Sequence, residues 1–184
     1  MRVAFTDFDG VLNSADWTAR RGGTPADWLD RSRDLDPTAV ARLNVIVEGT
    51  GAGVVISSSW RIMYPLDEIE KLLSDAGFRG EIVGVTPCYR SGSWESGRYA
   101  TRAEEIRAWL DEHPDVESFV ILDDDGLGEK CGPSPLDSRL VRTNILHGLQ
   151  PEHVEAAIEI LLGPHEPDRS ARSSKPGVPG AAPG

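Results

Sequence analysis

Hydrophobic residues cluster along this chain in five short runs, each bounded by glycine, proline or polar residues that favour turns. Their lengths and their content of valine and isoleucine are typical of strands. The runs are residues 2–6, 53–57, 81–86, 118–123 and 139–143. The sequence therefore predicts five strands spread over most of its length.

Between these runs, apolar residues recur every three or four positions, which is the spacing of one face of a helix. One such pattern starts after the Asp36-Pro37 pair, and the next ends at Gly77. A third stops before Pro114 and a fourth ends at Gly163. Strands that alternate with helices predict an α/β fold, with three Rossmann-like layers around a mostly parallel five-stranded sheet.

Three segments depart from this alternation. Residues 14–35 are mostly polar and interrupt the first strand-to-helix connection, so we expect a small flap there. Residues 124–138 are rich in glycine and proline and predict a loop near the functional site. Residues 164–184 contain little to bury and predict a disordered tail. We thus expect one domain over residues 1–163.

Length, hydrophobicity and charge exclude some classes of function. The 184 residues, 39% of them hydrophobic, suffice for one domain with a core. No basic leader precedes an apolar stretch, and no window approaches the roughly 18 apolar residues of a membrane span, so we expect a cytoplasmic protein without membrane partners. The net charge of −11 would repel phosphate backbones, which argues against a general nucleic-acid binder.

Two aspartates directly follow the first predicted strand. Asp7 and Asp9 stand in "VAFTDFDGVLN", at the carboxyl end of that strand, where open α/β sheets bind their ligands. Carboxylates two residues apart in an extended chain lie on the same side, about 6–7 Å apart, and can share a cation or a phosphoryl group. Gly10 then lets the backbone turn away. A pair of aspartates that only caps a turn is the alternative for this motif alone.

The fourth predicted strand ends in three adjacent carboxylates, Asp123, Asp124 and Asp125. Like charges beside a buried strand repel one another, so their placement indicates a cation that offsets them. Mg²⁺ suits this set, because it takes few protein carboxylates and keeps positions for water and phosphate oxygens. A solvated acidic turn is the alternative.

Hydroxyl and basic residues follow the second strand. Ser57, Ser58 and Ser59 offer hydroxyls and backbone N–H groups that can hold phosphoryl oxygens. The alternative is a serine-rich turn whose hydroxyls bond to the backbone. Arg61 comes next and is a candidate contact for substrate groups beyond the phosphate.

A further arginine precedes the acidic strand. Thr101 and Glu104 have the spacing of a capping box, which places Arg102 in the first turn of a helix. An arginine there could neutralise the clustered carboxylates and a phosphate together. A solvated side chain is the alternative.

Taken in order, these motifs resemble the motif set of a known enzyme superfamily. "FTDFDGVLN", "VVISSSW", an arginine before the fourth strand and "FVILDD" resemble the four motifs of the haloacid dehalogenase (HAD) superfamily of phosphohydrolases. More closely, the chain resembles the HAD domain class associated with Swiss Army Knife RNA repair proteins, over residues 3 to about 162. The resemblance implies a HAD-like fold and a Mg²⁺-dependent phosphatase.

The resemblance also implies roles for the residues of the first two motifs. Asp7 is the nucleophile that attacks phosphorus, and Asp9 is the general acid and base. The hydroxyl residue that orients the phosphoryl group is Ser57, with Ser58 as the alternative.

The last two motifs supply charge in the same scheme. The basic residue is Arg102, where the superfamily more commonly has a lysine, and Arg98 is the alternative. Asp123 and Asp124 hold the metal together with Asp7 and Asp9.

The expected function is hydrolysis of a phosphate monoester through an aspartyl-phosphate, with a nucleotide or a nucleic-acid end phosphate as the substrate. A catalytically idle HAD-like module that binds phosphate or a partner is the alternative. Trp17, in the predicted flap, is a candidate for stacking on a base of the substrate. Its alternative role is to anchor the flap to the core. The sequence does not set an oligomeric state.

Overall fold

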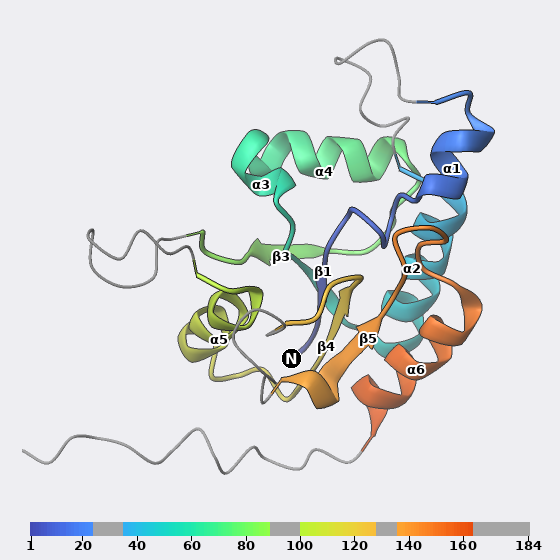
Figure 1. The fold of residues 1–184 in the computed structure, drawn as a ribbon. Coiled ribbons are helices and arrows are strands. Elements are labelled where there is room, and N and C mark those ends of the chain that lie inside the picture. The colour runs from blue at the N-terminus through green and yellow to red at the C-terminus, as the bar shows by residue number, and fades with distance from the viewer. Residues whose placement is uncertain (24–34, 89–99, 128–135, 164–184) are drawn as a thin grey trace, which may run out of the picture.

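The computed structural model describes residues 1–23, 35–88, 100–127 and 136–163 (Figure 1). The part of the predicted flap at 24–34 and the predicted tail at 164–184 lie outside the described residues. No helix in the described ranges is long and apolar enough to cross a bilayer.

Five parallel strands form one sheet in the order β3-β2-β1-β4-β5. The strands are β1 (Arg2–Thr6), β2 (Gly53–Ile56), β3 (Ile82–Val85), β4 (Ser118–Asp123) and β5 (Leu140–Arg142). The first strand occupies the centre, where Phe5 lies between Val55 and Ile121 of its two neighbours. The predicted α/β class and the five strand positions are confirmed, and every described pairing is parallel.

Six helices accompany the sheet in the described chain. They are α1 (Ala15–Arg20), α2 (Pro37–Thr50), α3 (Trp60–Met63), α4 (Leu66–Asp75), α5 (Arg102–Glu112) and α6 (Pro151–Leu162). The four longer ones are the predicted amphipathic helices. The two short helices, α1 and α3, were not predicted, and neither was a 3₁₀ turn at Asp137–Arg139 before β5.

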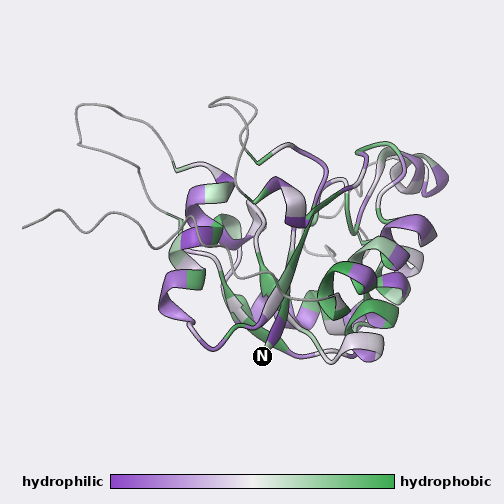
Figure 2. Ribbon diagram, turned by 90° about the horizontal axis from the view of Figure 1, so that it is seen from below, coloured by the Kyte–Doolittle hydropathy of each residue, from purple (hydrophilic) through white to green (hydrophobic). Residues whose placement is uncertain are grey.

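The helices cover the two faces of the sheet unequally (Figure 1). Apolar residues of α2, α4 and α6 pack on one face in the larger core cluster. On the other face, Ile106 and Trp109 of α5 pack against Val3, Phe5 and Ile121 of the sheet. Figure 2 shows the same division, with hydrophobic strands inside and hydrophilic residues on the outer surfaces of the helices.

Helix caps fix where α2 and α5 begin. The side chain of Asp36 accepts a hydrogen bond of 2.8 Å from the backbone N–H of Thr38, and Pro37 fills the first position of α2. Thr101 and Glu104 form the predicted capping box at α5. This cap places Arg102 at the start of α5, as the sequence predicts.

Candidate active site

The site lies at the edge of the sheet where β1, β2 and β4 end. Hydrogen bonds of the sheet continue past these ends: the N–H of Asp7 donates to the carbonyl of Leu122 at 2.9 Å, and that of Ser57 to Thr6 at 2.9 Å. The loops that carry the motif residues are therefore anchored directly to the central strands.

Three carboxylates meet at this edge. Asp7, Asp123 and Asp124 each offer an oxygen, and these oxygens lie within 4.8 Å of one another. Asp7 and Asp123 are buried in side chain, whereas Asp124 is partly exposed. Carboxylate oxygens at this spacing fit a hard divalent cation such as Mg²⁺.

Gly10 makes this arrangement sterically possible. Its φ of +71° is in the left-handed region, which favours glycine. A Cβ atom at this position would lie 2.3 Å from Cγ of Asp124, so any side chain would displace that carboxylate. The glycine of the first motif therefore serves both the turn and the acidic cluster.

The carboxylates of this cluster are held where ionisation is unfavourable. Burial, together with the charge of the neighbouring Asp7, raises the pKa of Asp123 to about 7, against the lowering effect of Arg102. Burial also raises the pKa of Asp7, although Arg102, the Ser58 hydroxyl and the N–H of Phe8 act in the opposite direction. Burial and the charge of Asp125 raise the pKa of Asp124. A bound cation would relieve this excess of negative charge.

Arg102 is the cation that the described chain places among these acids. Its Nη2 lies 3.0 Å from Oδ2 of Asp7, and its Nε lies 3.2 Å from Oδ2 of Asp123. One guanidinium thus links the ends of β1 and β4, as the sequence predicts for an arginine in this helical turn. The alternative third-motif residue, Arg98, lies outside the described residues.

A buried ion pair supports Arg102 from behind. Oε2 of Glu105 accepts from Nη1 of Arg102 at 3.4 Å and from Nη2 of Arg61 at 2.6 Å. Arg61 also donates to the carbonyls of Thr86, at 3.0 Å, and Ser58. Burial raises the pKa of Glu105, and the two arginines counteract it. Glu105 therefore contacts both arginines and lies where it can position Arg102.

This placement differs from the sequence prediction for Arg61. Its side chain is only 6% exposed and is occupied by Glu105 and by backbone carbonyls, so it presents no guanidinium to substrate. The chain turns through α3 and directs Arg61 inward, toward α5.

Asp9 lies in a different environment from Asp7. Its Oδ1 accepts from Nδ2 of Asn13 at 2.8 Å, and its Oδ2 accepts from Nε1 of Trp60 at 3.1 Å. Asn13 is itself fixed, because its Oδ1 accepts from the N–H of Gly10 at 3.1 Å. The carboxylate of Asp9 lies outside the group of three described above, so its predicted metal contact stays a prediction.

The second motif presents two buried hydroxyls with different partners. The hydroxyl of Ser58 accepts from the backbone N–H of Trp60 at 3.3 Å and lies near enough to Asp7 to lower the pKa of that carboxyl. The Oγ of Ser57 instead faces Thr86, at the end of the adjacent strand, at 3.5 Å. Of the two candidates, Ser58 is the one that reaches Asp7.

Trp17 lies on α1, beside two arginines. The guanidinium carbons of Arg20 and Arg21 lie 5.9 and 5.7 Å from the centre of its ring, within range of cation–π contact. Its predicted stacking role is untested. Trp28, the other tryptophan of the predicted flap, lies outside the described residues.

Sequence reasoning assigned no role to Asn13, Trp60 or Glu105. Asn13 and Trp60 stand inside the quoted motifs "FTDFDGVLN" and "VVISSSW", but only the folded chain shows that their side chains meet at Asp9. Glu105 follows the capping-box glutamate, and nothing in the local pattern signals its burial.

A parallel α/β sheet with acidic strand ends that surround an arginine defines a HAD-type domain. Residues 3–154 match the family described as the HAD domain in Swiss Army Knife RNA repair proteins, and the chain belongs to that family. Neither the curated proteins nor the solved structures contain a match. The family confirms the resemblance of the motifs and puts the chain in a superfamily of phosphatase-type hydrolases.

Proposed function

We propose that this protein is a Mg²⁺-dependent phosphatase that hydrolyses a phosphate monoester through an aspartyl-phosphate on Asp7. The observation that carries the proposal is the arrangement around Asp7. Its carboxylate meets Arg102, the Ser58 hydroxyl and two further carboxylates at the end of the central strand. A module that only bound phosphate would not need a carboxylate placed as a nucleophile, as Asp7 is here.

In the first step, an oxygen of Asp7 attacks phosphorus while the bond from phosphorus to the leaving oxygen breaks. Asp9 gives its proton to that oxygen, which departs as an alcohol. Arg102 and Ser58 lie beside Asp7, where they can hold the oxygens of the transferring group.

In the second step, Asp9 takes a proton from water, and the water oxygen attacks the phosphorus of the aspartyl-phosphate. The bond between phosphorus and Asp7 breaks, which releases inorganic phosphate, restores the carboxylate of Asp7 and leaves Asp9 protonated for the next cycle. Mg²⁺ bound by Asp7, Asp123 and Asp124 would supply positive charge that stabilises the phosphoryl oxygens.

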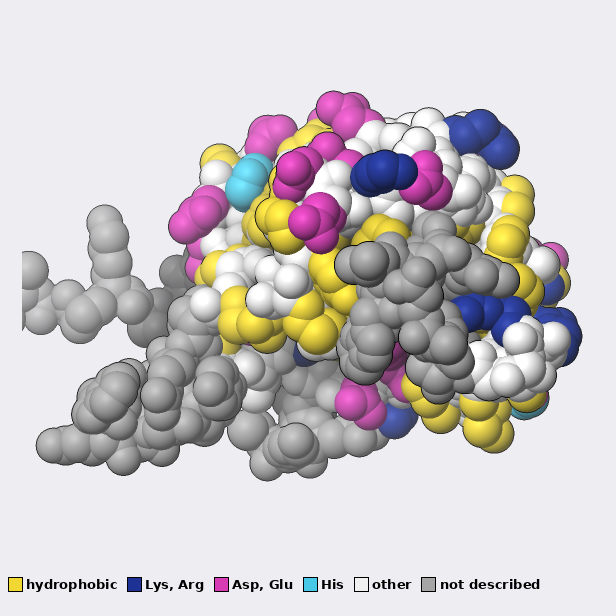
Figure 3. All heavy atoms as spheres, turned by 90° about the horizontal axis from the view of Figure 1, so that it is seen from above, with side chains coloured by type: hydrophobic (Ala, Val, Ile, Leu, Met, Phe, Trp, Pro, Cys, Tyr) yellow, Lys and Arg dark blue, Asp and Glu magenta, His cyan; other side chains and the backbone are white. Residues whose placement is uncertain are grey.

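The net charge of the protein favours a compact substrate. Seen from above, the described surface carries hydrophobic, acidic and basic side chains (Figure 3). The net charge of −11 would repel the phosphates of a long nucleic acid. A nucleotide, or the terminal phosphate of a nucleic acid, is the proposed substrate.

The test is release of phosphate from an aryl phosphate in the presence of Mg²⁺. We expect turnover in the wild type, none in Asp7→Asn, and none in excess chelator until Mg²⁺ is restored. In acid-quenched reactions, mass spectrometry should find phosphate on Asp7. Wild-type rates in Asp7→Asn, or no turnover of any phosphate ester by the wild type with Mg²⁺, would refute the proposal; the latter would favour a phosphate-binding module.

A further inference from the structure

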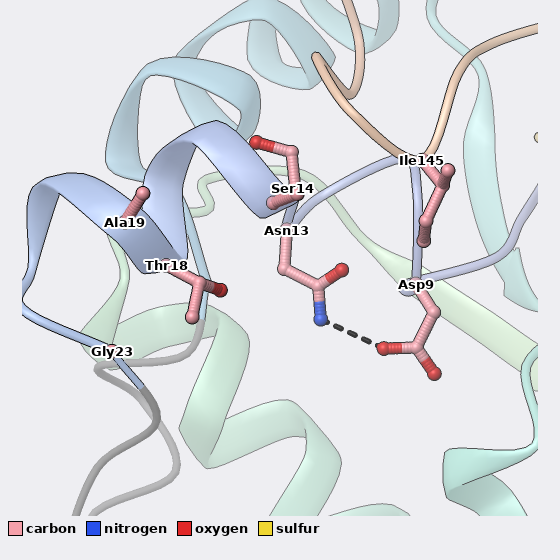
Figure 4. A pocket seen from close by; sticks show the side chains of 8 residues that line it. Asp9, Asn13, Ser14, Thr18, Ala19, Gly23 and Ile145 are labelled. Carbon is pink, nitrogen blue, oxygen red and sulfur yellow. Dashed lines mark hydrogen bonds between the residues drawn. The ribbon is translucent and has the colours of Figure 1, made fainter.

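A pocket of about 460 Å³ opens beside Asp9. It is lined by α1, by the loop that carries the first motif and by Ile145, which follows β5 (Figure 4). Asp9 contributes to the lining, whereas the three clustered carboxylates do not. The volume is within the ~300–1,000 Å³ typical of small-molecule sites.

The side of Asp9 that faces this pocket is well defined. The amide of Asn13 reaches toward Asp9 and bonds to its Oδ1, and both residues line the pocket (Figure 4). Trp60, which holds Oδ2, is buried and is absent from the described lining. A group seated in the pocket therefore lies next to the carboxylate that would protonate the leaving oxygen.

The chemistry of the lining is nearly neutral. Asn13 and Thr18 offer an amide and a hydroxyl, while Ala15, Ala19 and Ile145 offer apolar surface. The Ser14 hydroxyl caps α1, because it accepts from the N–H of Trp17 at 3.2 Å. Among the described lining residues there is no lysine or arginine, and Asp9 is the sole carboxylate.

We propose that this pocket binds the leaving group of the substrate, and that this group is an uncharged nucleoside, so that the substrate is a nucleoside monophosphate. The inference rests on the proposed phosphatase function, because it assigns the proton donor to Asp9. Ribose hydroxyls match Asn13 and Thr18, and the flat base matches the apolar surface that Ile145 supplies.

A second phosphate is a poor match for this pocket. It would meet no cation on the described lining and would lie near the carboxylate of Asp9, so both desolvation and repulsion disfavour it. The same argument disfavours the end of a nucleic acid, whose terminal nucleoside carries a phosphodiester.

The experiment fills the pocket and compares leaving groups. Thr18→Phe and, as a second variant, Ala19→Phe place a ring in the pocket. We expect each to lower kcat/KM for adenosine monophosphates at least tenfold more than for acetyl phosphate, whose leaving group is small. Arg20→Phe is the matched control on the same helix, because Arg20 does not line this pocket and its side chain is 65% exposed.

The substrate arm uses the wild type. Adenosine 3′- or 5′-monophosphate should exceed adenosine 3′,5′-bisphosphate and a terminally phosphorylated oligonucleotide in kcat/KM by at least tenfold. Equal or higher activity on the bisphosphate or the oligonucleotide would overturn the inference. Equal losses of both activities in Thr18→Phe and Ala19→Phe would overturn it too.

Binding of adenosine, followed by NMR titration, separates this inference from the proposed function. Adenosine should perturb the wild type and Arg20→Phe but not Thr18→Phe. If the wild type binds adenosine in this way yet releases no phosphate from any ester, the phosphatase proposal fails and the nucleoside pocket stands. If adenosine does not bind while acetyl phosphate is hydrolysed, the pocket assignment fails alone.

Discussion

Asp7 and Asp9 are two residues apart in the chain, yet the structure surrounds them with opposite kinds of chemistry. Asp7 lies among charges: Arg102 at 3.0 Å and the carboxylates of Asp123 and Asp124. Asp9 is held by neutral donors, the amide of Asn13 and the indole of Trp60. Charge is thus concentrated where phosphorus would be attacked. The proposed proton carrier forms no ion pair with the described residues, but its charge raises the pKa of Asp7 and of Asp124.

After the complete loss expected in Asp7→Asn, the largest effect comes from removing the proton carrier alone. Asp9→Asn keeps the shape and the hydrogen bond to Trp60, but it cannot donate or accept the proton. We expect kcat to fall by ~10²–10⁴-fold, which is the usual contribution of general acid–base catalysis. The measurement is steady-state turnover, with the exposed Asp16→Asn on α1 as control; a loss equal to that of Asp16→Asn would contradict the role.

The next largest effect is expected from removing the charge of Glu105, which contacts both Arg61 and Arg102. Glu105→Gln keeps the volume but leaves Arg61 and Arg102 without their shared anion. Breaking a buried pair costs about 3–5 kcal/mol, and because Arg61 retains backbone acceptors we expect the lower end of that range. Urea unfolding measures this loss. Glu112→Gln, exposed on the same helix, should be neutral.

The same variant also distinguishes a role of Glu105 in orienting Arg102 from a role in stability alone. If Glu105 orients Arg102, Glu105→Gln should lower kcat on an aryl phosphate while the protein is still folded. Wild-type kcat in the folded variant would show that the pair serves stability alone.

A smaller effect is expected from removing a neutral hydrogen-bond donor to Asp9. Trp60→Phe removes the N–H that holds Oδ2 of Asp9 but keeps a ring against Phe8, 5.1 Å away between centroids. Hydrogen bonds to charged groups contribute about 1.5–3 kcal/mol, so we expect kcat to fall roughly tenfold or more. Trp109→Phe is matched, because both tryptophans are 4% exposed, but it lies on the opposite face of the sheet. A similar kcat in the two variants would refute the orienting role of Trp60.

The last expected effect is a dependence of stability on pH in the absence of metal. The pKa of Asp123 is about 7 in the folded chain, above its ordinary value of 3.8. Between these values the folded chain keeps a proton that the unfolded chain has lost, so its stability falls as pH rises from about 4 to 7. The melting temperature should fall by ~2–4 °C for each kcal/mol of stability lost over this range.

Two comparisons check this dependence. Asp123→Asn should reduce the fall, because the titrating group is gone. Mg²⁺ should raise the melting temperature of the wild type most at pH 7 and above, where the carboxylates are ionised. An equal fall in Asp123→Asn would assign the dependence to other groups.

The sequence predicted the sheet and the charged side of the site because both follow from local patterns. Apolar runs mark the strands, and parallel strands bring their carboxyl ends to one edge, where the structure places Asp7, Asp123 and Asp124 together. The capping box at Thr101 fixed the position of Arg102. In each of these cases the backbone alone places the residue.

The remaining features depend on where side chains point. The sequence predicted Arg61 as an accessible arginine after a turn. In the structure it is buried and bonds to Glu105, which is distant in the chain. Ser57 and Ser58 are adjacent and chemically alike, and only their contacts separate them. The helices α1 and α3 have six and four residues, too few for an apolar period to appear.

The central position of β1 also bears on how the chain folds. Of the five described strands, β1 is synthesised first. One of its two partners, β4, is distant in sequence, since Arg2 pairs with Ser118. The apolar side chains of β1 must therefore wait for most of the domain to be made before both of their edges are covered. Pairing between such distant strands requires closure of a large loop and slows folding. Until it forms, the unpaired edge of β1 is exposed and prone to aggregation. A ribosome-bound fragment that ends before β4 would contain Asp7 and Asp9 but no site, and it would be a natural client for chaperones.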